Sequence, residues 1–197
     1  MERRDAKNII EALLFITEQP VPLKAFVELF DQEFPSEDVQ AMVLEIVQRY
    51  LEQGSSLELR EIAGGWQFST RSEFGPWIRK LFKDRLTYRL SSSAMETLSI
   101  IAYKQPITRS EIEEIRGVEV SAVLDTLLER RLARVAGRKE TVGRPLLYGT
   151  TPDFLKAFGL KGLEALPSID SLAPLETVEP ASKPVSEAPV EQGSEVS

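Results

Sequence analysis

The chain of 197 residues contains no cysteine and no histidine. Without cysteine there can be no disulfide and no thiolate metal site, and an intracellular location is favoured. Without histidine there is no Ser-His-Asp triad, no imidazole–zinc site and no histidine general base. The sequence also lacks a glycine-rich loop followed by Lys-Ser or Lys-Thr that could hold a nucleotide. These absences argue against an enzyme, and we expect no cofactor, no metal and no small-molecule ligand.

Long hydrophobic segments are also missing. No apolar run approaches the roughly 20 residues that a membrane-spanning helix needs. The first ten residues, MERRDAKNII, place Asp5 directly before the apolar run and contain no small-residue cleavage site, so they do not resemble a signal peptide. We therefore expect a cytoplasmic protein without membrane contact.

Basic residues are scarce at the C-terminal end, where much of the net charge of −7 lies. Residues 167–197 contain six acidic residues, one basic residue, five prolines and no aromatic residue. Such a segment cannot bury enough apolar area to offset the entropy that it would lose on ordering. We predict a disordered, acidic, proline-rich tail over residues 167–197, and the alternative is a low-affinity docking segment.

The sequence before this tail contains one pattern twice. Residues 11–29 (EALLFITEQPVPLKAFVEL) and 96–115 (ETLSIIAYKQPITRSEIEEI) each consist of an apolar helix, a Gln-Pro break and a shorter amphipathic helix. Further on, the segment from Phe68 to Phe74 is echoed by the segment from Tyr148 to Phe154. Because the two matches occur in the same order, we predict one small module that is used twice.

The first module reads as three helices followed by a β-hairpin, which is the order of a winged helix. Asp5 is the expected cap of the first helix, and Ala63-Gly64-Gly65 suits a tight hairpin turn. Apolar residues recur at helical spacing in some segments and alternate with polar residues in others, and these two patterns locate the helices and the strands. We expect helices over about 5–17, 23–30 and from Ser36 to the glycine at 54, alternating strands at 57–60 and 66–69, and a closing helix over 74–82.

The second module repeats this order. Residues 93–96 and 108–111 both fit a capping box, and Thr151-Pro152 suits the start of a closing helix. A third helix over 119–130 and strands over 132–136 and 146–149 enclose a longer wing at 137–145. We therefore predict a mainly α protein with small β-hairpins (α+β): an N-terminal winged-helix domain over 1–83, a linker over 84–92, a C-terminal winged-helix domain over 93–166, and the tail.

The first helix is apolar over most of its circumference. Its inner stripe consists of Ile9, Ile10, Leu13, Leu14 and Ile16, whereas Ala12 and Phe15 fall on the other side. A helix of this kind is usually covered from two directions. Either the neighbouring domain covers Ala12 and Phe15, or they form a dimer interface.

The third helix of the second module does not suit the reading of DNA bases. Its outward face carries Asp125, Glu129 and Ala122 and lacks the arginine, lysine, asparagine and glutamine that contact base edges. The wing that follows is basic, because residues 130–144 contain six basic residues and only Glu140 as an acid. This cluster is a salt-bridged solvent edge, a phosphate contact, or a docking site for an acidic protein segment.

Several strings in both modules closely resemble the segregation and condensation protein B family. The resemblance covers roughly residues 6–166 in order and with matching spacing. The strings are EALLF (11–15), AGGWQF (63–68), AMETL (94–98), IIAYKQPITR (100–109), EI (111–112), IRGV (115–118) and GRPLLYGTT (143–151).

This resemblance implies a non-catalytic scaffold. Members of the family dimerise through their N-terminal winged helices and bind the kleisin subunit ScpA, which bridges the heads of the SMC ATPase. The condensin-like assembly acts in chromosome condensation and partition during cell division. The resemblance favours Ala12 and Phe15 as dimerisation residues, and Tyr103, Gln105, Arg144 and Tyr148 as kleisin contacts. We expect DNA to bind weakly and non-specifically at most; a winged-helix DNA-binding transcription regulator is the alternative function.

Overall fold

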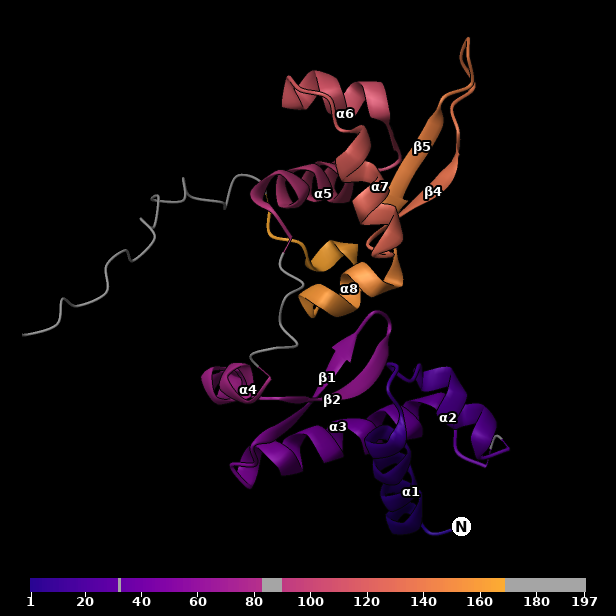
Figure 1. The fold of residues 1–197 in the computed structure, drawn as a ribbon. Coiled ribbons are helices and arrows are strands. Elements are labelled where there is room, and N and C mark those ends of the chain that lie inside the picture. The colour runs from indigo at the N-terminus through magenta and orange to yellow at the C-terminus, as the bar shows by residue number, and fades with distance from the viewer. Residues whose placement is uncertain (32, 83–89, 169–197) are drawn as a thin grey trace, which may run out of the picture. The chain divides into compact units, whose positions relative to one another are not determined.

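The computed structural model describes residues 1–31, 33–82 and 90–168 and consists mainly of helices with two small antiparallel sheets (Figure 1). No helix in these ranges is long and apolar enough to cross a membrane. Most of the predicted linker and nearly all of the predicted tail lie outside the described residues. The proposed domain boundaries therefore stay a prediction.

The first module has the predicted order of elements. Helix α1 (Arg3–Ile16) begins before Asp5, and Glu2 occupies the cap position without a side-chain hydrogen bond. Asp5 as the cap is thus wrong, although its carboxylate still lies in the first turn, where the helix dipole favours negative charge. The other elements are α2 (Leu23–Leu29), α3 (Ser36–Glu52), β1 (Leu57–Ile62), β2 (Gly65–Thr70), η1 (Ser72–Phe74) and α4 (Gly75–Leu81).

The turn of the first hairpin is tighter than the three residues that the sequence indicated. Ala63 and Gly64 both have positive φ, 50° and 75°, as a two-residue turn between twisted strands requires. Gly65 already belongs to β2, and a Cβ there would lie 2.8 Å from the backbone of Pro20 and Val21. The absence of a side chain lets Val21 pair with Trp66 through backbone hydrogen bonds of 2.9 and 2.8 Å. The segment after the first Gln-Pro break is thereby attached to the hairpin.

The second module contains α5 (Ser92–Lys104), β3 (Ile107–Thr108), α6 (Arg109–Arg116), α7 (Ser121–Glu129), β4 (Ala133–Arg138), β5 (Leu146–Thr150), α8 (Pro152–Phe158) and η2 (Leu163–Ala165). Its sheet has the order β3-β5-β4. Strand β3, which pairs Ile107 with Tyr148, was not predicted, because two residues are too few to show alternation. The β4–β5 hairpin forms the wing, which projects beyond α5, α6 and α7 in Figure 1.

Two of the three helix caps predicted for the second module are present in the structure. Thr108 and Glu111 form the predicted capping box at α6, and the Thr151 hydroxyl accepts a hydrogen bond from the Phe154 amide. The box predicted at Ser93 is wrong, because α5 starts two residues earlier than that cap requires and Ser91 caps it. Glu96 instead pairs with Arg116 at 3.0 Å.

Glu111 combines the capping box with a link to the wing. Its carboxylate accepts hydrogen bonds from the Thr108 amide and hydroxyl and lies 2.6 Å from Lys139 Nζ. The hydrogen bond from Lys139, and then those from Thr108, lower the pKa of Glu111 to about 2. One carboxylate therefore joins the start of α6 to β4 and the wing.

Each module has its own hydrophobic core. Helix α3 contributes four fully buried residues to the first core, and α5 and α7 contribute most of the second. The buried residues are Ala6, Ile10, Leu14, Phe26, Phe30, Val39, Met42, Val43, Ile46 and Leu59 in the first, and Ala94, Leu98, Ile101, Ala102, Ile107, Ile112, Val120, Leu124, Leu127, Ala133, Tyr148 and Phe154 in the second.

The repeat is visible in burial as well as in order. Phe26 of α2 and Ile112 of α6 are fully buried, whereas Leu29 and Ile115, three residues further along, are about half exposed. The matched apolar spacing of the two short helices therefore marks one core position and one surface position in each copy.

Thr108→Ala should lower the free energy of unfolding by about 1 to 2 kcal/mol, because the α6 cap and its buried hydroxyl are lost. Urea unfolding of the full chain measures the change. Thr126→Ala is the matched control, because that hydroxyl bonds only the Ala122 carbonyl within α7 and should matter little. Equal destabilisation by both substitutions would contradict a capping role.

Glu111→Gln should remove a pH-dependent part of the stability. Because the pKa of Glu111 is lower in the folded chain, its stabilisation is complete above the unfolded pKa near 4.5 and disappears as the pH falls toward 2. The difference in unfolding free energy between wild type and variant should shrink between about pH 6 and about pH 3. Glu114→Gln, on the same helix and without an ion pair among the described residues, is the control. A difference that does not change with pH would refute the assignment.

Candidate partner-binding surfaces

The outer face of α1 is apolar and open. Phe15 and Ile16 are 78 % and 76 % exposed, and Ala12 is also exposed. Ile16, which the sequence placed on the inner stripe, lies at the end of the helix outside the core. Both predicted dimerisation residues, Ala12 and Phe15, are thus on a surface that the first module leaves uncovered.

A groove of about 330 Å³ lies beside this face and is lined by Asn8, Glu11, Ala12, Phe15, Tyr50, Leu57 and Phe68. The rings of Tyr50 and Phe68 pack at a tilt of 52° with their centroids 5.0 Å apart. Tyr50 of α3 packs against the first core, and only the fold brings α3 and β2 next to Ala12 and Phe15. The groove therefore offers aromatic surface to a partner that covers α1.

Charged groups hold one side of this groove in place. The Glu11 carboxylate accepts hydrogen bonds from Arg49 and from the Tyr50 hydroxyl. Burial of the ring, and then the hydrogen bond to Glu11, raise the pKa of Tyr50 to about 12. Tyr50 thus stays neutral and keeps its hydroxyl directed at Glu11 over the physiological pH range.

Helix α4 presents a second exposed apolar face. Trp77 is 69 % exposed and Leu81 78 % exposed, whereas Phe74 and Ile78 are half-buried. Only part of the apolar surface of the closing helix predicted over 74–82 is therefore buried among the described residues. Exposed aromatic and aliphatic side chains together are typical of surfaces that contact other proteins.

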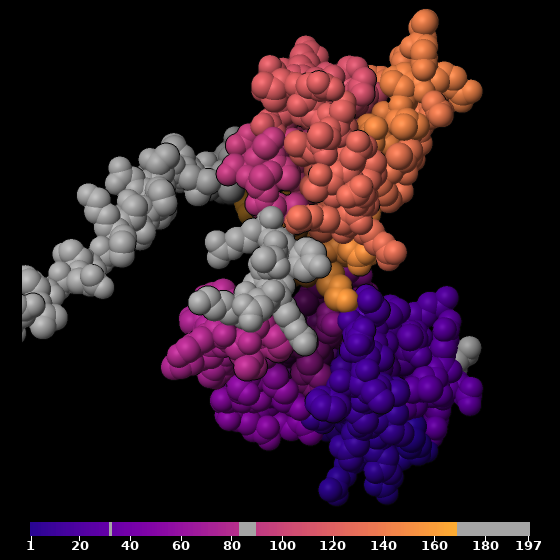
Figure 2. Space-filling view, viewed as in Figure 1, coloured from indigo at the N-terminus to yellow at the C-terminus, as the bar shows by residue number. Residues whose placement is uncertain are grey.

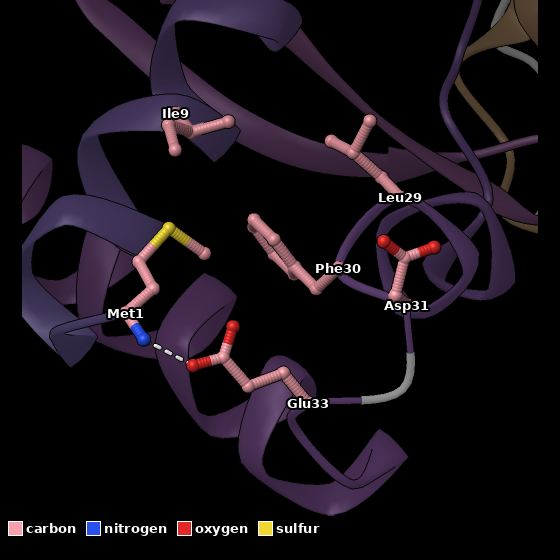
Figure 3. Close-up of a pocket in the computed structure, with 6 residues that line it drawn as sticks. All are labelled: Met1, Ile9, Leu29, Phe30, Asp31 and Glu33. Carbon is pink, nitrogen blue, oxygen red and sulfur yellow. Dashed lines mark hydrogen bonds and ion pairs between the residues drawn. The ribbon is translucent and has the colours of Figure 1, made fainter.

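A third apolar surface is a hollow of about 360 Å³ between the start of α1 and the end of α2. Ile9 and Leu29 lie on its walls, and the rings and chains of Phe30 and Met1 face it (Figure 3). Asp31 and Glu33 also line it, and the Glu33 carboxylate is paired with the N-terminal ammonium of Met1 (Figure 3). The hollow was not predicted, because the surface position of Leu29 becomes evident only once the buried face of α2 is known.

In the second module, Gln105 joins α5 to β5. Its amide oxygen accepts a 2.8 Å hydrogen bond from the Thr150 amide, and its amide nitrogen donates to the Ala102 carbonyl at 3.1 Å and to the Thr150 hydroxyl at 3.0 Å. The polar groups of Gln105 are therefore occupied within the module. Its contact with a partner stays a prediction, and its structural role is explained without one.

The other predicted kleisin contacts differ in accessibility. Tyr148 is only 9 % exposed and is part of the second core. Tyr103 is partly exposed near the end of α5, and Arg144 is exposed on the wing. Arg144 and Tyr148 line one pocket, whereas Tyr103 and Gln105 lie outside it.

This pocket, of about 310 Å³, lies between the start of α6 and the wing. Three arginines line it, and no acidic residue does: Arg109, Ser110, Arg138, Gly143, Arg144, Pro145, Leu146 and Tyr148. Arg109 was not selected from the sequence as a member of the basic cluster, because it lies about 30 residues before the wing. The space-filling view in Figure 2 shows the wing as a projection from the surface of the module.

The outward face of α7 is as the sequence indicated. Asp125, Glu129 and Ala122 are all exposed there. Two carboxylates on this face would repel DNA phosphates, so the geometry disfavours a regulator that inserts α7 into the major groove. Among the residues that the structure describes, no group of three or more acidic side chains is arranged to hold a metal ion.

Comparisons with known proteins agree with the sequence motifs. The family model for "Segregation and condensation complex subunit ScpB" matches residues 8–169. Segregation and condensation protein B of Desulforamulus reducens is 44 % identical over 168 residues, which cover 85 % of this chain and 91 % of that protein.

Two solved structures are also similar. The crystal structure of ScpB from Mycobacterium tuberculosis is 33 % identical, with a TM-score of 0.39, and the match covers 81 % of this chain and 98 % of that one. A structure described as a dimer of the ScpB N-terminal domain complexed with an ScpA peptide is 26 % identical, with a TM-score of 0.36, over 40 % of this chain and 95 % of that one.

The match to the family model extends over most of the chain and confirms the resemblance inferred from the motifs. Members of this family are non-catalytic subunits of an SMC complex that acts in chromosome segregation and condensation. The chain belongs to the segregation and condensation protein B (ScpB) family.

Proposed function

We propose that this chain is a dimeric scaffold that binds the kleisin ScpA and, through it, the SMC ATPase on the chromosome in the cytoplasm. Membership of the ScpB family carries this proposal. The related structure in which a dimer of ScpB N-terminal domains holds an ScpA peptide supports it. The exposed apolar surfaces of the first module are what such a scaffold needs.

The dimer interface belongs to the N-terminal winged helix, residues 1–83. Phe15, Ile16 and Ala12 supply an apolar centre, and Tyr50 and Phe68 border it with aromatic surface. Covering such a centre removes apolar area from water, which is the main favourable term in association. The partly buried hydrogen bond from Tyr50 to Glu11 holds this border in place before the partner binds.

ScpA has two candidate contact regions. On the C-terminal winged helix, residues 93–166, these are Tyr103, Gln105, Arg144 and Tyr148. On the N-terminal module it is the hollow formed by Met1, Ile9, Leu29 and Phe30, whose apolar walls suit the apolar face of a helix. In the related complex the ScpA peptide is bound to N-terminal domains alone, which favours the hollow over the second module as the contact.

Purification of the full chain from its native cells tests the proposal. ScpA should copurify in stoichiometric amount, and the isolated chain should have twice the monomer mass of 22.1 kDa. A chain that is monomeric at micromolar concentration and retains no ScpA would contradict the proposal. Leu29→Asp and Tyr103→Ala, measured for ScpA binding, then distinguish the hollow from the second module as the contact.

Phe15→Asp should convert the dimer to a monomer, because the interface would bury a carboxylate without a partner. A cost of about 3 kcal/mol corresponds to about a hundredfold weaker association. Light scattering coupled to size-exclusion chromatography measures the mass. Val142→Asp, which places the same charge on a fully exposed apolar position of the wing, is the control and should leave a dimer. A Phe15→Asp variant that remains dimeric would place the interface elsewhere.

A further inference from the structure

We infer that the pocket between α6 and the wing binds a phosphate of the nucleic-acid backbone, which gives this scaffold a weak DNA contact of its own without sequence preference. This goes beyond the proposed function, in which the chain reaches the chromosome only through ScpA and SMC. The inference rests on the charges that line the pocket, on their ion-pair partners and on the shape of the surrounding surface.

The pocket collects cationic groups from two separate elements. Arg109 comes from the first residue of α6, whereas Arg138 and Arg144 come from the two sides of the wing. The Ser110 hydroxyl adds a further donor. Planar guanidinium groups match the oxygens of a phosphate, which they bind through paired hydrogen bonds.

Two of these arginines carry charge that the protein does not neutralise. Arg138 donates to the Arg144 carbonyl at 3.1 Å, and neither residue forms an ion pair with an acid among the described residues. By contrast, Arg109 lies 3.7 Å from Glu113, and Lys139 is paired with Glu111. Glu140, also on the wing, is exposed but does not line the pocket. Arg138 and Arg144 are therefore the groups available for an anion.

The backbone keeps these groups at the mouth of the pocket. Arg144 has a positive φ of 41°, and its amide bonds to the Thr141 carbonyl, so the tip of the wing is a closed turn. The Lys139 amide bonds to the Pro145 carbonyl across the wing. Tyr148 forms the buried floor beneath them. The arginines are thus presented by an ordered hairpin and need little rearrangement to bind.

Nucleic acid fits this pocket better than an acidic peptide does. Arginine clusters bind acidic peptides as well as phosphates, but this cluster lies on a projecting wing beside a short hollow of about 310 Å³ and not along an extended groove. A phosphate needs only convergent donors. Because α7 exposes Asp125 and Glu129, contact is limited to the wing and carries no base readout.

The inference is tested by fluorescence anisotropy. A labelled duplex of random sequence, about 30 base pairs long, is titrated with the full chain at about 50 mM and at about 200 mM salt. The wild type should bind weakly at the lower salt. The double variant Arg138→Ala/Arg144→Ala should lose about two phosphate contacts, so its affinity for the duplex should fall less steeply with salt concentration. The wild type should therefore lose about tenfold more affinity than the variant over this fourfold change in salt.

Lys24→Ala with Lys161→Ala is the matched control, because it changes the net charge equally at exposed sites away from the pocket. It should keep the salt dependence of the wild type. The dimer mass of the same variants should not change, and their ScpA binding is measured alongside because Arg144 is also a candidate ScpA contact. The inference is overturned by a wild type that does not bind at low salt, by equal effects of both double variants, or by an arginine variant that loses ScpA but not DNA.

Discussion

The second module depends on the hydrogen bonds of Gln105. Its amide group joins the end of α5 to Thr150, the last residue of β5, and a Cβ at Gly149 would approach the amide oxygen to 2.9 Å. With β5 held against α5, β3 pairs on one side of β5 and β4 on the other. The sheet order, the buried position of Tyr148 and the origin of the wing all follow from this attachment. In the first module the backbone pairing of Val21 with Trp66 makes the corresponding connection.

The two copies of the module have diverged at their surfaces rather than in their cores. The first exposes apolar side chains on α1, on α4 and around the hollow beside α2, all suited to contacts with protein. The second has an acidic α7 and a basic wing. Buried positions such as Phe26 and Ile112 can be equivalent in both copies, because the core requires only apolar volume. The surface is free to differ, and in a scaffold protein it is the surface that acts.

The element order of both modules was predictable because strong local signals mark it. Helical spacing in α3, the capping box at Thr108 and the two glycines after Ala63 each act over a few residues. The errors occurred where local signals compete. Ser91 and Ser93 are both suitable caps, and only the packed start of α5 decides between them. Strand β3 gave no signal of its own, since it exists only by pairing with β5.

The sequence by itself determined the family, the winged-helix order, the apolar surplus of Ala12 and Phe15 and the acidic face of α7, because these depend on residue type and spacing along one element. The tertiary structure decided which residues share a surface. It brought Tyr50, Leu57 and Phe68 beside Phe15, placed Arg109 with Arg138 and Arg144, and turned Gln105 and Tyr148 toward the interior. Such groupings join residues that are tens of positions apart, and they form only when separate elements pack on a common core.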